Sequence, residues 1–103
     1  MALWDRVRGL PPPTGHHDAL RQAEQGVAIY WRPGCGFCAA LGARVRRYAD
    51  RAAWVNIWED DEAAAYVRSV NGGAETVPTV VIDGVPHTNP PPRLVRKALA
   101  RHG

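Results

Sequence analysis

The stretch "VAIYWRPGCGFC", residues 27–38, decides the fold and contains both cysteines of the chain, Cys35 and Cys38. Residues 27–31 form a compact apolar run, which is typical of a strand buried on both faces. Residues 32–34 then turn the chain, and we expect a helix to begin at or just after Cys35. The first cysteine is therefore predicted to occupy an exposed position between the end of a buried strand and the first turn of a helix.

This position suits thiol chemistry. Unpaired backbone N–H groups and the helix dipole stabilise negative charge at a helix N-terminus, so a thiolate is favoured at Cys35. Cys38 follows one helical turn later, where its sulfur can reach that of Cys35. Thiol–disulfide exchange requires an attacking and a resolving thiol, and the spacing provides both.

Two other interpretations of the cysteine pair were weighed. A closed zinc site needs about four ligands, and only His16 and His17 are candidates to complete one. They follow a proline-rich segment and are expected to be solvated loop residues, so no metal site is predicted. Inert core cysteines are disfavoured by the flanking Gly34 and Gly36 and by the strand–turn–helix setting.

The rest of the chain alternates between strand and helix patterns. The predicted strands are 27–31, 54–58 and a hairpin of 79–82 and 85–87. The predicted helices are 18–25 capped by Asp18, one from residue 35, one after the acidic residues 59–62, and one capped by Asn89 and opened by Pro90. The last three helices should bury one face each, formed in turn by Phe37, Leu41, Val45 and Tyr48, by Ala63, Tyr66, Val67 and Val70, and by Leu94, Val95, Ala98 and Leu99.

These elements predict an α/β fold, namely a four-stranded mixed sheet flanked by helices in the order β-α-β-α-β-β-α after a short N-terminal helix. A right-handed crossover makes strands 27–31 and 54–58 parallel. We expect residues 1–26 to form an N-terminal extension with a short helix, and residues 27–103 to form the domain proper.

Composition excludes several classes of function. The chain has 103 residues, a net charge of +3 and a hydrophobic share of 46%, as expected for one ordinary globular domain. Its basic residues are spread along the sequence, so no nucleic-acid partner is predicted. No apolar stretch is long enough for a membrane span or a signal peptide, and we interpret the protein as cytoplasmic. Close cysteine pairs in such reducing compartments are more often catalytic or metal-binding than structural.

A second feature lies far along the chain, in "TVPT" at residues 76–79. Pro78 stands at the very start of a predicted strand, where it removes one donor from the ladder. A proline at this place usually marks a turn. A cis bond between Val77 and Pro78 would instead leave the backbone of Val77 free to pair with an extended substrate.

Together, "WRPGCGFC", "TVPT" and the element order resemble the glutaredoxin branch of the thioredoxin fold over residues 27–101. "SVNGG" at 69–73 and "TNP" at 88–90 are similar to the mycoredoxins, the actinobacterial glutaredoxin-like proteins that work with mycothiol. The resemblance implies that Cys35 is the nucleophile and Cys38 the resolving cysteine. It also implies a cis-proline loop at Val77 and Pro78 that pairs with substrate.

The same resemblance suggests further binding residues. Arg32 matches a basic residue near the small thiol, with a plain surface charge as the alternative. Phe37 stands where mycoredoxins have tyrosine. The aspartate that glutathione-type members have after the hairpin is absent here, which makes glutathione binding doubtful. Thr88 and Asn89 are candidate partners for the hydroxyls of mycothiol, although Asn89 also suits a helix cap.

The implied activity is reduction of protein–mycothiol mixed disulfides, with mycothiol as co-substrate and no tightly bound cofactor. The expected partners are S-mycothiolated or disulfide-containing proteins, and a monomer is expected. Two alternatives remain open. One is a thioredoxin-like dithiol reductase that receives electrons from a flavoprotein reductase. The other is an iron–sulfur cluster carrier, which Gly36 after the first cysteine permits.

Overall fold

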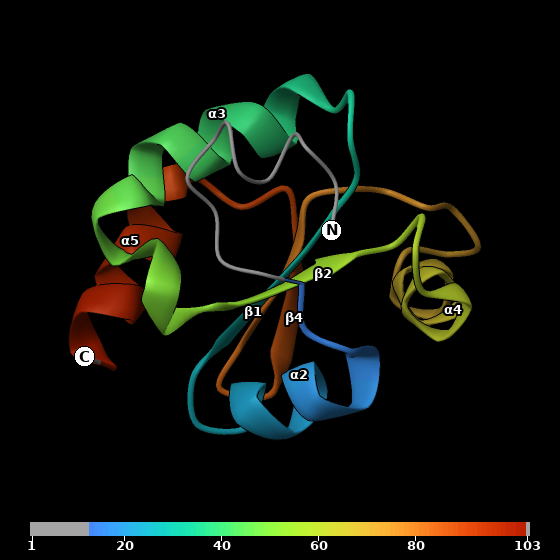
Figure 1. Cartoon of the computed structure of the whole chain (residues 1–103), viewed down its shortest axis with the longest axis horizontal. Coiled ribbons are helices and arrows are strands. Elements are labelled where there is room, and N and C mark those ends of the chain that lie inside the picture. Colours follow the sequence, from blue (N-terminus) through green and yellow to red (C-terminus); the bar gives the residue numbers. More distant parts are fainter. Residues whose placement is uncertain (1–12, 103) are drawn as a thin grey trace.

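The computed structural model describes residues 13–102, which form a four-stranded sheet with helices on both faces (Figure 1). The predicted order of strands and helices is confirmed. The elements are α2 (His16–Ala23), β1 (Val27–Trp31), α3 (Gly36–Val45), the 3-10 helix η1 (Arg46–Arg51), β2 (Ala53–Asn56), α4 (Asp61–Val70), β3 (Thr79–Ile82), β4 (Val85–Thr88) and α5 (Pro92–Arg101).

The sheet is mixed, as predicted, with the strand order β2-β1-β3-β4. β1 pairs in parallel with β2 and antiparallel with β3, and β3 pairs antiparallel with β4. The β3–β4 hairpin turns at Asp83 and Gly84, whose φ angles of 50° and 83° are both left-handed. Such a turn matches the twist of the strands that it joins. The C-terminal end of β1 therefore lies between the end of β2 and the start of β3.

Two apolar layers enclose the sheet. Alternate residues of β1 face opposite sides, so that Val27, Ile29 and Trp31 pack toward α3 and α5, whereas Ala28 and Tyr30 pack toward α2 and α4. All five β1 residues are buried, which confirms the expectation from the continuous apolar run. The helices of the two layers lie on opposite sides of the sheet in Figure 1.

The N-terminal helix begins at His16, two residues earlier than predicted. Asp18 lies in its first turn, and the cap position is held by Gly15, which has no side-chain acceptor. Its Ala19 and Ala23 are fully buried in the same cluster as β1, so this helix packs on the sheet. The predicted irregular segment, residues 1–16, lies mostly outside the described residues, because the structure describes nothing before residue 13. No helix of residues 13–102 is long and apolar enough to cross a membrane.

Three predicted inner positions are wrong in part. Phe37 and Leu94 keep 67% and 40% of their surface exposed, and α3 ends at Val45, so Tyr48 lies in η1 and is only partly buried. A helical period identifies side chains that share a face. It does not tell how far the sheet beneath that face extends.

Two predicted boundaries are also corrected. β2 ends at Asn56, and Trp58 is 62% exposed rather than part of a central strand. Asn89 does not cap the last helix, which begins at Pro92 with Pro91 at its cap. Asn89 instead adopts a left-handed φ of 45°, and its N–H donates to the carbonyl of Pro78 at 2.7 Å. Its backbone therefore continues the β3–β4 pairing one step beyond Thr79 and Thr88.

Candidate active site

Cys35 is the N-cap residue of α3. Its backbone is extended, at φ −91° and ψ 112°, and its Sγ accepts the N–H of Cys38 at 3.2 Å. Gly34 makes this arrangement possible, because its φ of +75° turns the chain between β1 and α3 in a conformation that side chains disfavour. The sulfur thus takes the place of a capping oxygen at the positive end of a helix, as the sequence predicted.

The two thiols are less accessible than expected. Cys35 keeps 8% of its surface exposed and Cys38 keeps 3%, whereas the sequence predicted an exposed first cysteine. Both are free thiols. The loop before β3, which is distant in sequence, packs against Cys35, and its Val77 carbonyl lies 3.7 Å from the Cys35 Sγ.

The second cysteine is poorly suited to ionise, for a structural reason. Burial raises the pKa of the Cys38 thiol to about 12, and a side-chain hydrogen bond to Cys35 acts in the same direction. The backbone and charge of Arg32 oppose this shift without cancelling it. Cys38 is therefore protonated at neutral pH, which leaves Cys35 as the thiol placed to attack.

The cis-proline loop lies against Cys35. The bond between Val77 and Pro78 is cis, as the sequence suggested. The Val77 carbonyl faces Cys35, while the Pro78 carbonyl accepts the N–H of Asn89. Two predicted site residues, Val77 and Asn89, thus meet at the cis-proline loop, and Val77 contacts Cys35.

The basic residue before the cysteines has a partner that the sequence did not reveal. The guanidinium of Arg32 lies 5.4 Å from the ring centre of Trp58 and donates to the carbonyl of Pro33 at 3.1 Å. Trp58 reaches this place because the N–H of Ile57 bonds to the Trp31 carbonyl at 2.9 Å and holds the end of β2 beside the end of β1. The only sign of this contact in the sequence is Trp58 itself, at the end of the apolar run 54–58.

The last two predicted site residues lie differently. Phe37 is exposed in the first turn of α3, close in sequence to Cys35. Thr88 donates its hydroxyl to the side chain of Asn71, whose amide in turn donates to the Val67 carbonyl at 2.8 Å and to Thr79 at 3.1 Å. Thr88 therefore ties β4 to the end of α4, a role that sequence reasoning missed.

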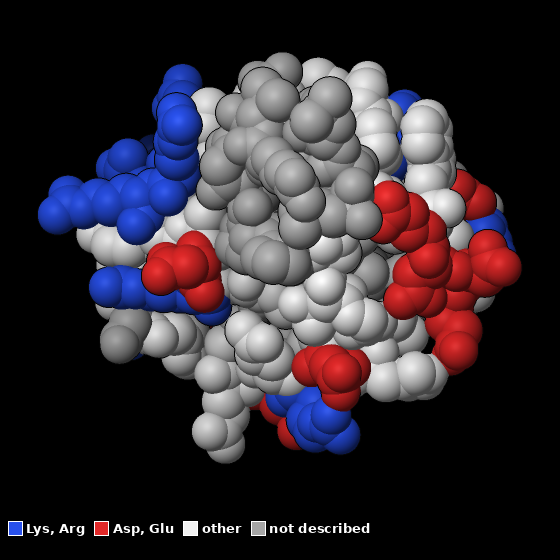
Figure 2. Space-filling model, in the orientation of Figure 1, with Lys and Arg blue, Asp and Glu red and all other residues white. Residues whose placement is uncertain are grey.

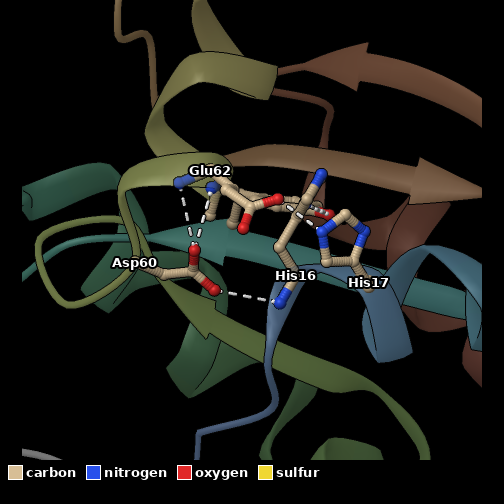
Figure 3. Close-up of polar contacts among 6 residues, drawn as sticks. His16, His17, Asp60 and Glu62 are labelled. Atoms are coloured by element: carbon tan, nitrogen blue, oxygen red, sulfur yellow. Dashed lines mark hydrogen bonds and ion pairs between the residues drawn. The ribbon is translucent and has the colours of Figure 1, made fainter.

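The two histidines that were candidates to complete a zinc site lie in a helix rather than a loop, and only His17 is solvent-exposed as expected. Both lie in the first turn of α2, and His16 is buried with its Nδ1 2.8 Å from the hydroxyl of Tyr30. Figure 3 shows His17 paired with Glu62 and the N–H of His16 bonded to Asp60. Residues 13–102 contain no group of three or more His, Cys, Asp or Glu side chains able to hold a metal ion.

A capped, asymmetric cysteine pair facing a cis-proline on a mixed four-stranded sheet defines a thiol–disulfide site of the thioredoxin fold. A solved thioredoxin from Malassezia sympodialis agrees with this fold, at a TM-score of 0.54 and 20% identity over 89% of this chain and 95% of that one.

The glutaredoxin family model matches residues 27–87. Two Mycobacterium tuberculosis proteins with glutaredoxin in their names, from strains CDC 1551 and H37Rv, are each 40% identical to this chain over 78 residues, which cover 73% of it and 90% of each relative. The chain belongs to the glutaredoxin family, and its activity is that of a glutaredoxin-like thiol–disulfide oxidoreductase.

Proposed function

We propose that this oxidoreductase reduces mixed disulfides between proteins and mycothiol, with Cys35 as the nucleophile. The observation that carries the proposal is the position of Cys35, whose sulfur caps α3 and faces the carbonyl of Val77. The resemblance of "SVNGG" and "TNP" to the mycoredoxins, together with relatives from Mycobacterium tuberculosis, supports mycothiol as the small thiol.

The reaction has two exchange steps. The Cys35 thiolate attacks the mycothiol sulfur of the mixed disulfide, so that a Cys35–mycothiol disulfide forms and the protein thiolate leaves. A second mycothiol thiolate then attacks the mycothiol sulfur bound to Cys35. Mycothiol disulfide forms, and the Cys35 thiolate is regenerated. In sum, the mixed disulfide and one mycothiol thiol give the protein thiol and mycothiol disulfide, so the protein sulfur is reduced while mycothiol is oxidised to its disulfide.

Cys38 is not required in this route. Its thiol is buried and protonated at neutral pH, so its attack on Cys35 is slow compared with attack by a free thiolate. An intramolecular disulfide between the two cysteines is then a side branch, or a path for dithiol substrates. This assignment favours mycothiol reduction over a dithiol cycle that receives electrons from a flavoprotein reductase.

Several surface groups suit the small thiol. Mycothiol is a sugar thiol without carboxylates, and Asn89 and Thr88 place polar side chains at the end of β4, beside the cis-proline loop. Arg32 lies near Cys38, and the exposed Phe37 stands between the two cysteines in sequence. We further propose that the protein acts as a cytoplasmic monomer on S-mycothiolated or disulfide-containing proteins and has no tightly bound cofactor.

The test is turnover of a mycothiol mixed disulfide and of its glutathione counterpart by the wild type, Cys38→Ser and Cys35→Ser proteins. We expect clear preference for mycothiol, an active Cys38→Ser protein and an inactive Cys35→Ser control. Equal turnover of the two disulfides would remove mycothiol from the proposal. Loss of activity in Cys38→Ser would support the dithiol route, to be assayed with a flavoprotein reductase. Visible absorbance after anaerobic purification would support the iron–sulfur alternative.

A further inference from the structure

The arginines of the described chain divide into partnered and unpartnered groups. Most have a carboxylate, a carbonyl or an aromatic ring as partner, namely Arg21, Arg32, Arg47, Arg51, Arg68 and Arg101. Among residues 13–102, the arginines without such a contact are Arg44, Arg46, Arg93 and Arg96. Three of these four surround one pocket.

This pocket lies between the last turn of α3 and the start of α5. Its lining consists of Arg44, Pro92, Arg93 and Arg96, and its volume is about 50 Å³. That volume is sufficient for a few waters or one small oxyanion. No carboxylate lines it, and all three arginines are solvent-exposed, so the charged side chains around an entering anion are all positive.

The start of α5 adds a second, independent argument. A helix N-terminus favours acidic residues, and α4 conforms with a capping Asp60 followed by Asp61 and Glu62. α5 has no acidic residue in its first turn and no side-chain cap, and it carries Arg93 there instead. An anion in the pocket would offset the cation that Arg93 places in this first turn.

The surface charge shows the same division on a larger scale. In Figure 2 the basic side chains gather on the side of α3 and α5, and the acidic ones gather over α4 on the opposite side. Because guanidinium groups match tetrahedral oxyanions through paired N–H donors, phosphate is the ligand class that best fits three of them.

We propose that Arg44, Arg93 and Arg96 form a binding site for a phosphate group, either free phosphate or the phosphate of a small phosphorylated molecule. Arg44 lies nine residues along α3 from Cys35, about 13 Å at the helical rise. The site is therefore separate from the thiol chemistry and does not depend on the identity of the small thiol.

The test titrates inorganic phosphate into the full-length protein by calorimetry at pH 8, with ionic strength held constant by sodium chloride. We expect saturable binding that weakens about tenfold or more in Arg93→Gln and Arg96→Gln, because each substitution removes a charge-assisted hydrogen bond. The matched control is Arg46→Gln, which removes the same charge from an unpartnered arginine outside the pocket. It should change the affinity by less than about twofold. Disulfide reduction should be unchanged in Arg96→Gln.

A second titration uses glycerol phosphate in place of phosphate. Tighter binding of the ester supports a phosphorylated small molecule, and tighter binding of free phosphate supports phosphate itself. The proposal is overturned if neither saturates, or if Arg46→Gln weakens binding as much as Arg96→Gln. It is also overturned if short single-stranded DNA binds while phosphate does not, since that pattern indicates a diffuse nucleic-acid surface.

Discussion

Asp60 joins two helices, and its removal gives a prediction whose size can be worked out from the contacts. One carboxylate oxygen, Oδ1, accepts the N–H groups of Glu62 and Ala63 and caps α4. The other, Oδ2, accepts the N–H of His16 at 3.0 Å and holds the start of α2 (Figure 3). The two oxygens therefore serve two separate elements.

The expected losses follow from this division. An N-cap is worth about 1 kcal/mol, and a half-buried hydrogen bond to a carboxylate is worth about the same. Asp60→Ala should therefore lower the free energy of unfolding by about 2 kcal/mol. Asp60→Asn keeps one oxygen for the cap but cannot accept the His16 N–H through its amide nitrogen, so it should lose about 1 kcal/mol.

The assay is urea unfolding at pH 8 followed by tryptophan fluorescence, with thermal unfolding as a second measure. A loss of 2 kcal/mol corresponds to a fall in Tm of roughly 10 °C for a domain of this size. Asp61→Ala is the control, because Asp61 is an exposed first-turn residue whose loss should cost about 0.5 kcal/mol. Equal losses for Asp60→Asn and Asp60→Ala would refute the division of roles between the two oxygens.

Three further predictions concern titration and exposure. Burial lowers the pKa of His16, so the unfolded chain takes up a proton first, and stability should fall as pH drops below about 6.5. Urea unfolding as a function of pH should show this slope in the wild type and a weaker one in His16→Gln. Since the pKa of Cys38 is raised, iodoacetamide at pH 7 should modify the wild type at Cys35, and mass spectrometry should find Cys35→Ser nearly unlabelled; equal labelling would contradict this. Phe37→Ala should change unfolding by less than about 0.5 kcal/mol because the ring is exposed, yet raise the KM for a mixed disulfide. Val85→Ala, an exposed residue at the far end of β4, should leave that KM unchanged.

The parts of the fold that sequence predicted are those governed by local chemistry. The apolar run 27–31 forms the central strand because it is buried on both faces. Gly34 supplies the left-handed turn that places Cys35 at a helix cap, and Asp83-Gly84 supplies the hairpin. Each of these depends on a few adjacent residues, so the pattern alone was sufficient.

The parts that sequence missed depend on contacts between distant residues. His16 is buried because Tyr30 and Asp60 lie beside it, and neither is near it in sequence. Asparagine is a common helix cap, but the N–H of Asn89 donates to the Pro78 carbonyl, and its backbone has a left-handed φ. In both cases a tertiary partner outweighs the local preference.

The different surroundings of Cys35 and Cys38 explain why only Cys35 is suited both to attack a disulfide and to leave from one. The N–H of Cys38 and the positive end of α3 both interact best with a negatively charged sulfur at position 35. In a mixed disulfide this sulfur is neutral, and part of that stabilisation is absent. Release of the Cys35 thiolate restores it, which makes Cys35 a good leaving group in the second exchange. At Cys38 the backbone and charge of Arg32 favour a thiolate, but burial within the first turns of the helix outweighs them. The same helix start that prepares Cys35 for attack therefore also favours its release.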